Sequence, residues 1–250
     1  MKLKNKVALV TGGSSGFGEA FCKRFALEGA RLVVADIDDA NGERVAQEIV
    51  DKGGEAFFVH ADVSVANDVE TLVAACAERY DGLDILMNNA GIGSARASVV
   101  DMTEAQFDRI FSINVKSIFL LTHHAVPLMR TGGGVIINTA STSAIRPRPL
   151  ISAYSASKSA VITLTKAYAL ELAEDKIRVN ALAPVAADTP LFRDYLNGDQ
   201  ELLERTESAI PVGRLCHPDD MSAAALFLCS DEAQFLTGVC LPVDGGWTAG

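Results

Sequence analysis

The chain has 250 residues, of which 49% are hydrophobic and 22% charged, and its formal net charge is −10. Folding at this length buries roughly three quarters of the surface of the unfolded chain, so a full core can form without metals or disulfides. The negative charge disfavours binding to nucleic acid and to anionic membrane surfaces. No stretch approaches the ~18 apolar residues of a membrane helix, and the apolar run behind the basic N-terminus is too short for a secretory signal.

The cysteines and histidines show no pattern of a disulfide framework or a metal site. The five cysteines are odd in number and widely spaced, which is typical of reduced structural thiols in the cytoplasm. His123 and His124 are adjacent, but no third ligand accompanies them at a useful spacing. No linker, repeat or low-complexity tract divides the sequence. We therefore expect a cytoplasmic protein with one domain over residues 1–250 and no metal.

Short apolar runs alternate with longer segments of helical spacing along the chain. Strands are expected at residues 6–10, 31–35, 56–60, 84–87, 134–138, 177–181 and 239–243. Helices are expected at residues 16–28, 40–52, 66–79, 152–173 and 218–229, with one long or broken helix at 103–129. Thr103 and Gln106 have the spacing of a capping box at the start of that long segment.

This alternation predicts an α/β fold with a doubly wound parallel sheet of about seven strands, of the Rossmann type. Several runs are continuously apolar, as expected for strands buried on both faces. Ligands of such sheets bind beyond the carboxyl ends of the strands. Functional residues are therefore expected directly after each apolar run.

A glycine-rich turn follows the first expected strand. Residues 11–18 read Thr-Gly-Gly-Ser-Ser-Gly-Phe-Gly and lead into a helix. Glycines in this position allow a tight turn and let backbone N–H groups approach a pyrophosphate, and the helix N-terminus adds partial positive charge. The spacing is a relative of the dinucleotide fingerprint rather than a copy of it, and its place between strand and helix favours a phosphate site.

Asp36 ends the second expected strand, 20 residues after Gly16. A carboxylate at this position can accept hydrogen bonds from both hydroxyls of an adenosine ribose. No lysine or arginine close to it in the sequence could hold a 2′-phosphate. Two like charges a few ångströms apart repel by on the order of 1–4 kcal/mol, so Asp36 favours NAD over NADP.

Tyr154 and Lys158 are four residues apart in a helical segment, which places them one turn apart on the same face. Ser141 lies thirteen residues before Tyr154, at the end of an expected strand. One ammonium about 4 Å away stabilises a phenolate by ~1 kcal/mol in water and by ~4 kcal/mol at an effective dielectric near 20. A lysine can therefore activate a tyrosine only in a partly dry cleft.

These motifs together resemble the short-chain dehydrogenase/reductase family, in its shorter, single-domain branch. The matching residues extend over nearly the whole chain: residues 11–18, Asp62-Val63, Asn88-Asn89-Ala90-Gly91, Asn114, Ser141, Tyr154 with Lys158, Pro184 with Thr189, and Asp244-Gly245-Gly246. The resemblance implies an oxidoreductase that transfers a hydride between a nicotinamide coenzyme and a secondary alcohol or its ketone. With Asp36, the expected coenzyme is NAD.

The resemblance also implies roles for single residues. Tyr154 is the acid/base, Ser141 steadies the substrate oxygen, and Lys158 binds the nicotinamide ribose and lowers the pKa of the tyrosine. Asn114 holds a water that links Lys158 to solvent. The residues expected to bind the coenzyme are Gly12, Ser14, Ser15, Gly16, Phe17, Gly18, Asp36, Ile37, Asp62, Val63, Asn89, Ala90, Gly91, Tyr154, Lys158, Pro184, Ala187 and Thr189.

Within that set, the resemblance places Asp62 and Val63 at the adenine and Asn89 on the adenosine ribose side. Ala187 and Thr189 are expected at the carboxamide end of the coenzyme. The family also implies self-association, as a homotetramer.

Two positions depart from the family pattern. Phe17 stands where a smaller aliphatic residue is usual in the phosphate turn. Val185 replaces the glycine that commonly follows Pro184, which bears on the loop over the nicotinamide. Neither change alters the expected reaction type.

Three segments are expected to form the substrate site, at residues 92–98, 142–150 and 186–213. They mix apolar and hydroxyl side chains and name no substrate. Residues 191–195 have the pattern of an amphipathic lid or of an ordinary surface helix. Arg146 and Arg148 could bind an anionic substrate, although packing at an interface or at a helix entry is the simpler interpretation.

Three other functions compete with this reading. An NADP-dependent 3-oxoacyl-thioester reductase is disfavoured by Asp36. A nucleotide-sugar epimerase or dehydratase usually needs a longer C-terminal substrate region. A module that senses NAD without turnover often lacks the tyrosine or the lysine, and this chain has both.

Overall fold

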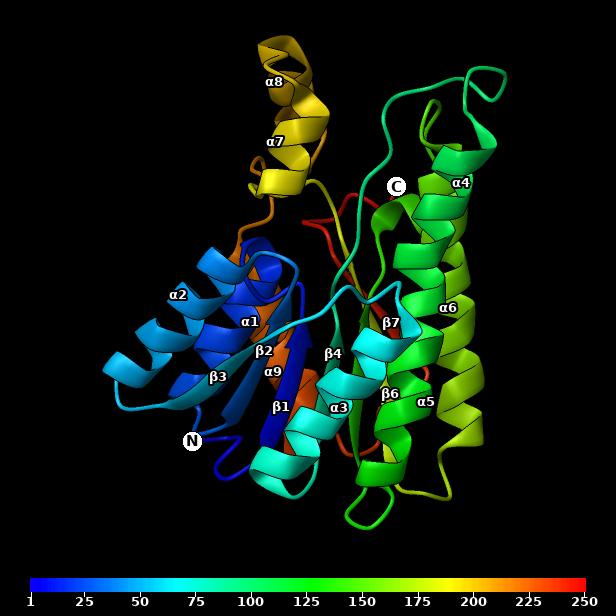
Figure 1. The fold of residues 1–250 in the computed structure, drawn as a ribbon. Coiled ribbons are helices and arrows are strands. Elements are labelled where there is room, and N and C mark those ends of the chain that lie inside the picture. The colour runs from blue at the N-terminus through cyan, green and yellow to red at the C-terminus, as the bar shows by residue number, and fades with distance from the viewer.

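Seven strands form a parallel sheet at the centre of the protein, in the order β3-β2-β1-β4-β5-β6-β7. The computed structural model describes all 250 residues (Figure 1). The strands are β1 (Val7–Thr11), β2 (Arg31–Asp36), β3 (Glu55–His60), β4 (Ile85–Asn88), β5 (Gly134–Thr139), β6 (Ile177–Pro184) and β7 (Cys240–Val243). The expected doubly wound sheet is confirmed.

The helices cover both faces of the sheet (Figure 1). Those of the first layer are α1 (Gly16–Leu27), α2 (Asp39–Asp51) and α9 (Pro218–Cys229). Those of the second layer are α3 (Ala66–Tyr80), α4 (Glu104–Phe111), α5 (Ser117–Met129) and α6 (Ser152–Glu171). Short helical turns lie at Ser112–Lys116, Thr142–Ala144 and Asp231–Ala233.

The strand β1 shows how the sequence produces this arrangement. All five of its residues are buried, and successive side chains point to opposite faces of the sheet. Ala8 and Val10 pack in the core beneath the first helix layer, whereas Val7 and Leu9 pack in the core beneath the second. A strand that serves two cores must be apolar throughout, which explains its unbroken apolar run.

The segment 103–129 is a broken helix. Thr103 and Gln106 form the expected capping box, with Thr103 N donating to Gln106 Oε1 at 2.9 Å. A single π-helical stretch, Ser112–Lys116, then separates α4 from α5. Such turns insert one residue into the helical register and redirect the side chains next to them.

The segment 186–213, expected as a substrate loop, contains two helices, α7 (Pro190–Leu196) and α8 (Gln200–Ser208). Both lie beyond the carboxyl ends of the strands and outside the two helix layers (Figure 1). A helix was one of the two structures expected at residues 191–195, whereas α8 was not expected. Only two of the nine residues of α8, Leu202 and Leu203, are apolar, so the sequence offered too few apolar positions to indicate a helix.

No helix is both long and apolar enough to cross a membrane. The structure contains no group of three or more histidine, cysteine, aspartate or glutamate side chains that could hold a metal ion.

Candidate active site

A cleft of about 1450 Å³, partly open to solvent, lies at the carboxyl ends of the central strands. It lies where β1 is flanked by β2 on one side and by β4 on the other, so the connections leave the sheet in opposite directions. In doubly wound sheets this switch in strand order creates a crevice between the outgoing loops.

The turn between β1 and α1 forms the floor of this cleft. Gly12 has a φ of +64°, a backbone conformation that favours glycine. At Gly18 an added Cβ would collide with the carbonyl oxygen of Gly12, so the turn closes only without a side chain there. Ser15 precedes α1, and no side chain caps that helix end. Its first N–H groups therefore suit a pyrophosphate.

Asp36 lies at the end of β2 and is fixed by the glycine turn. Its Oδ2 accepts hydrogen bonds from Ser14 N at 3.1 Å and Ser14 Oγ at 2.6 Å. Its Oδ1 accepts hydrogen bonds from the N–H groups of Ile37 at 2.8 Å and Asp38 at 3.2 Å. The carboxylate is thus held at the wall of the cleft, with the adjacent Asp38 adding negative charge.

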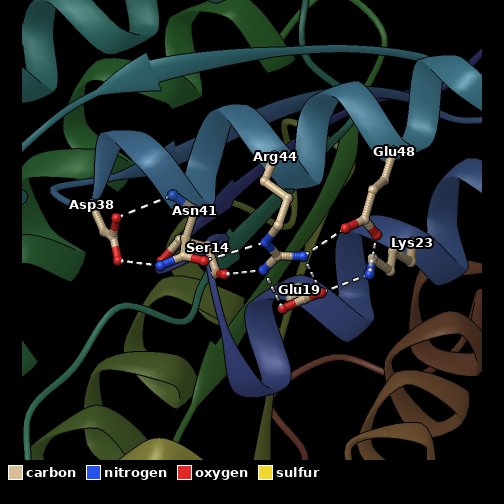
Figure 2. Close-up of polar contacts among 7 residues, drawn as sticks. All are labelled: Ser14, Glu19, Lys23, Asp38, Asn41, Arg44 and Glu48. Carbon is tan, nitrogen blue, oxygen red and sulfur yellow. Dashed lines mark hydrogen bonds and ion pairs between the residues drawn. The ribbon is translucent and has the colours of Figure 1, made fainter.

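A basic side chain lies behind this turn, which corrects the expectation that none is near Asp36. Arg44 of α2 donates from Nη2 to the carbonyl oxygen of Ser14 at 3.3 Å (Figure 2). The sequence did not show this because Arg44 is eight residues beyond Asp36. Only the packing of α2 against α1 brings Arg44 to the turn that contains Ser14.

The charge of Arg44 is matched by two carboxylates (Figure 2). Its Nη1 lies 3.0 Å from Glu19 Oε1 and 2.8 Å from Glu48 Oε1. Lys23 contacts the same two carboxylates, each at 2.6 Å. These ion pairs hold the pKa of Glu48 at about 2, mainly through hydrogen bonds from Lys23 and Arg44. The guanidinium is therefore held in place and neutralised behind the turn.

Tyr154 and Lys158 come from the first turns of α6 and face the cleft. Lys158 Nζ donates to the carbonyl oxygen of Thr139, at the end of β5, at 2.7 Å. The same nitrogen lies 5.9 Å from the centroid of the Tyr154 ring. Ser141 follows β5, and its hydroxyl contacts Ser143 Oγ at 2.9 Å. Ser141 hydrogen-bonds to Tyr154, so Ser141 and Lys158 both lie beside the phenol.

Asn114 joins this group through the π-helical stretch between α4 and α5. Its side chain is buried, accepts a hydrogen bond from Ile92 N at 2.8 Å and donates to Ile92 O at 3.0 Å. It also donates to Ser157 Oγ at 3.1 Å. An added Cβ at Gly91 would meet both Asn114 Oδ1 and Lys158 Nζ within 3.4 Å. Asn114 therefore ties the β4 loop to α6 beside Lys158.

Burial disfavours the charged form of both Tyr154 and Lys158. It raises the pKa of the Tyr154 phenol above its ordinary value near 10, and hydrogen bonding from Ser141 opposes this. It lowers the pKa of Lys158 to about 8. The expected lowering of the tyrosine pKa is therefore not produced by the side chains of the chain alone, because desolvation outweighs them.

A second cavity of about 760 Å³, also partly open, adjoins the cleft. Ser141, Thr142 and Ser143 line it together with residues of α7. Tyr154 lines both the cleft and this cavity, whereas Lys158 lines only the cleft and Ser141 only the cavity. The phenol therefore lies at the border between the two spaces.

The structure places all but two of the predicted coenzyme-binding residues on the wall of the cleft. Gly18 lies beneath the turn and packs against Gly12 and Asn89. Ala187 lines the adjoining cavity instead. Residues that also line the cleft and were not predicted as coenzyme contacts are Asp38, Ala61, Ile92, Arg109, Ile113, Thr139, Ala140, Pro190 and Leu191. Ile92, Pro190 and Leu191 belong to the segments expected to form the substrate site.

Some of the missed residues had a signal in the sequence and others had none. Ala61 precedes Asp62, and Thr139 follows the run of β5, so both lie where strand ends were expected. Arg109 and Ile113 come from α4 and the π-helical stretch. Their direction depends on the interruption of the helix, which the pattern did not locate.

The two departures from the family pattern are accommodated without strain. Val185 is buried and has no positive φ, so this position does not need a glycine. Its N–H donates to the carbonyl oxygen of Val243 at 3.4 Å, and the loop continues through a bridge between Ala187 and Cys216. Phe17 lines both spaces, with its ring 6.4 Å from that of Phe21.

The burial of Lys158 predicts that its removal stabilises the fold. A free lysine titrates near 10.5, so keeping Lys158 charged at neutral pH costs the folded state about 3 kcal/mol. This cost is complete below pH 8 and disappears as the pH rises toward 10.5, because the unfolded state then also loses the proton. Lys158→Met should raise the free energy of unfolding at pH 7 by about 1–3 kcal/mol. This range already subtracts the contribution of the lost hydrogen bond to Thr139.

Urea unfolding at pH 7 and pH 9 measures this effect, with a smaller gain expected at pH 9. The matched control is Lys166→Met, an exposed lysine on the same helix. Destabilisation by Lys158→Met, or an equal gain from Lys166→Met, would contradict the assignment of a buried ammonium that has no carboxylate partner.

Comparisons with known proteins agree with this geometry. The family model described as enoyl-(acyl carrier protein) reductase matches residues 12–248. The chain is 42% identical to 4-formylbenzenesulfonate dehydrogenase of Comamonas testosteroni, over 98% of this chain and 99% of that protein. It is 39% identical to cyclopentanol dehydrogenase of Comamonas sp. (strain NCIMB 9872), over 99% of both.

A solved structure extends the likeness to three dimensions. The crystal structure of 3-ketoacyl-(acyl-carrier-protein) reductase from Brucella melitensis, complexed with NADH, matches with a TM-score of 0.92 and 45% identity. The match covers 98% of this chain and 99% of that one. From the family model, the relatives and the shared fold, we conclude that the chain belongs to the short-chain dehydrogenase/reductase family of oxidoreductases.

Proposed function

We propose that this protein is an NAD-dependent dehydrogenase that oxidises a secondary alcohol to its ketone and catalyses the reverse reduction. The observation that carries the proposal is the position of Tyr154 between the cleft and the adjoining cavity. A phenol at that border can exchange a proton with a substrate hydroxyl in the cavity while the coenzyme occupies the cleft. The relative named for cyclopentanol, a secondary alcohol, supports this substrate class.

The residues of the cleft fit a nicotinamide dinucleotide. The glycine turn and the start of α1 suit the pyrophosphate, Asp36 suits the adenosine ribose, and Lys158 suits the nicotinamide ribose. When bound, the oxidised coenzyme supplies the hydride acceptor and a positive charge beside the phenol. Asp62, Val63 and Thr189 line the same cleft and complete the proposed contacts.

The proposed roles of the protein groups follow from their positions. Ser141 donates a hydrogen bond to the substrate oxygen and holds it beside Tyr154. The phenolate oxygen of Tyr154 accepts the hydroxyl proton during oxidation and returns it during reduction. Lys158 orients the ribose and favours the phenolate electrostatically, and Asn114 fixes the surroundings of Lys158 through Ile92 and Ser157.

We infer NAD rather than NADP from the charges around the ribose position. Asp36 and Asp38 both line the cleft, so a 2′-phosphate there would meet like charge. Arg44 lies behind the same turn and could attract a 2′-phosphate, but its guanidinium is paired with Glu19 and Glu48. The NADH bound to the Brucella melitensis structure supports the same choice.

A 3-oxoacyl-thioester reductase is the second candidate, favoured by the 45% identity to a 3-ketoacyl-(acyl-carrier-protein) reductase. Reduction of an acetoacetyl thioester at a rate above that of simple ketones would select it. The alcohol dehydrogenase proposal expects the opposite order of rates.

We further propose a homotetramer in a reducing, cytoplasmic compartment. Phe119 on α5 is 51% exposed and Leu170 on α6 is 81% exposed. Exposed apolar side chains of this kind are expected on helix faces that a second copy covers. All five cysteines are free. Sedimentation at the monomer mass would contradict the self-association.

Tyr154→Phe removes only the phenol hydroxyl, so it should reduce kcat by about 100-fold to 10,000-fold. NAD affinity, measured by calorimetry, should change less than about threefold because the ring remains in place. Tyr168→Phe is the matched control, since Tyr168 is on the same helix and lines neither space. Activity of Tyr154→Phe close to that of the control would refute the acid/base role.

The proposed proton transfer also fixes the sign of the pH dependence. Oxidation needs the phenolate, so kcat/KM for the alcohol should rise with pH until Tyr154 has lost its proton. Reduction needs the protonated phenol and should fall over the same range. Profiles measured in both directions at constant ionic strength test this, and parallel slopes would count against Tyr154 as the proton carrier.

Asp36→Ala should narrow the preference for NAD over NADP at least tenfold, because the repulsion of a 2′-phosphate is removed. Adding Glu19→Gln should narrow it further by freeing one side of the Arg44 guanidinium. Asp39→Ala is the control, since Asp39 is near Asp36 but does not line the cleft. The ratio of kcat/KM values for the two coenzymes gives the result, and an unchanged ratio in Asp36→Ala would exclude the ribose contact.

A further inference from the structure

The cavity beside Ser141 and Tyr154 contains one charged side chain, that of Arg148. The other lining residues are apolar or carry hydroxyl groups, and none is an aspartate or glutamate. Arg148 lies in the segment that follows β5, seven residues after Ser141. The cavity in which the substrate alcohol is proposed to bind therefore carries a positive charge.

The guanidinium of Arg148 is held in place by an aromatic ring. Its carbon Cζ lies 4.6 Å from the centroid of the Trp247 ring, a cation–π distance. Burial lowers the pKa of Arg148, and no carboxylate opposes this effect. Tyr195 of α7 lines the same cavity. The side chain is thus oriented without a partner that neutralises it.

No carboxylate or backbone carbonyl pairs with Arg148. It forms none of the ion pairs of the structure and none of its side-chain hydrogen bonds, although a guanidinium has five N–H donors. Arg148 is half-buried and no protein group pairs its charge, so its donors remain available to a ligand anion.

The neighbouring Arg146 shows that packing on Trp247 does not require this arrangement. Its Cζ lies 5.1 Å from the same ring, but its Nη1 donates to the carbonyl oxygens of Trp247 at 3.2 Å and Gly250 at 2.9 Å. Arg146 is exposed and does not line the cavity. Arg146 therefore holds the C-terminal segment, whereas the N–H donors of Arg148 have no protein partner beside the cavity.

We propose that Arg148 binds an anionic group of the substrate, so that the preferred secondary alcohol or ketone carries a carboxylate or sulfonate. This inference rests on the proposed function, because it assigns the substrate class of the same site. A chain with a net charge of −10 repels anions overall, so an anionic substrate needs a local cation such as this one. The guanidinium fork matches the two oxygens of a carboxylate.

The test compares 4-(1-hydroxyethyl)benzoate with 4-(1-hydroxyethyl)benzamide, which have the same number of heavy atoms and differ in charge. The wild type should oxidise the benzoate with kcat/KM at least tenfold above that of the benzamide. Arg148→Gln should lower the benzoate value at least tenfold and leave the benzamide value within threefold. Arg148→Lys should recover part of the benzoate activity, since it restores the charge without the fork.

Arg146→Gln is the matched control and should leave the ratio of the two substrates unchanged. NAD affinity of each variant checks that the cleft is intact. If both compounds are poor substrates, quenching of bound NADH fluorescence by benzoate and by benzamide gives the same comparison. Equal handling of the charged and neutral probes by both methods, or an equal loss in Arg146→Gln, would overturn the inference.

Failure of the inference is distinguishable from failure of the proposed function. Oxidation of neutral secondary alcohols that is lost in Tyr154→Phe supports the function whatever Arg148 does. If the wild type oxidises the benzamide and the benzoate with equal kcat/KM, only the assignment to Arg148 fails. If it oxidises no secondary alcohol with NAD, the proposed function itself fails.

Discussion

Burial of the Tyr154 phenol, at the border of the two spaces, and of the Lys158 ammonium beside it is the constraint on which the rest of the site depends. Burial opposes the charged form of each side chain, so neither would be selected for stability. The surrounding structure holds them in position, through the bond from Lys158 to Thr139 and through the bonds that Asn114 makes to the β4 loop and to α6. The partial burial that disfavours their charges also strengthens any interaction with charge brought by a ligand.

The coenzyme side of the site is governed by a balance of fixed charges. The turn presents backbone N–H groups, and Asp36 places a carboxylate beside them. A free Arg44 would make the charge beside Asp36 positive. Its guanidinium is instead paired with Glu19 and Glu48, and Lys23 also pairs with Glu48. Arg148, on the substrate side, is the opposite case, a cation that the protein orients and leaves without a carboxylate. The two arginines show that the partners of a cation, rather than its presence, determine what a site attracts.

The periodicity of the sequence was sufficient for the sheet and most of the helices. Strands buried on both faces leave unbroken apolar runs, and helices that pack on them leave a clear spacing, as in β1 and α3. The exposed helix α8 has only two apolar residues, Leu202 and Leu203, so it was missed. The π-helical stretch was also missed, because the sequence allowed either a long helix or a broken one.

The residues of the site likewise fall into those that the sequence could predict and those that it could not. Residues at strand ends, such as Asp36 and Ser141, could be placed from sequence because the topology of a parallel sheet gathers strand ends at one edge. The contact between Arg44 and Ser14 depends on how α2 packs against α1, which no local pattern encodes. The pKa of Tyr154 likewise depends on burial in three dimensions, and the expectation from sequence counted the attraction of Lys158 without the full cost of desolvation.

The central claim is that Tyr154 carries the proton and that charge from the bound coenzyme is needed to lower its pKa. Titration of ¹³C-labelled tyrosine by NMR, with the Tyr154 signal assigned from its absence in Tyr154→Phe, measures this directly. We predict a pKa above the ordinary value of tyrosine without coenzyme and a clear decrease in the presence of saturating NAD. A Tyr154 signal whose pKa is the same with and without NAD would contradict it.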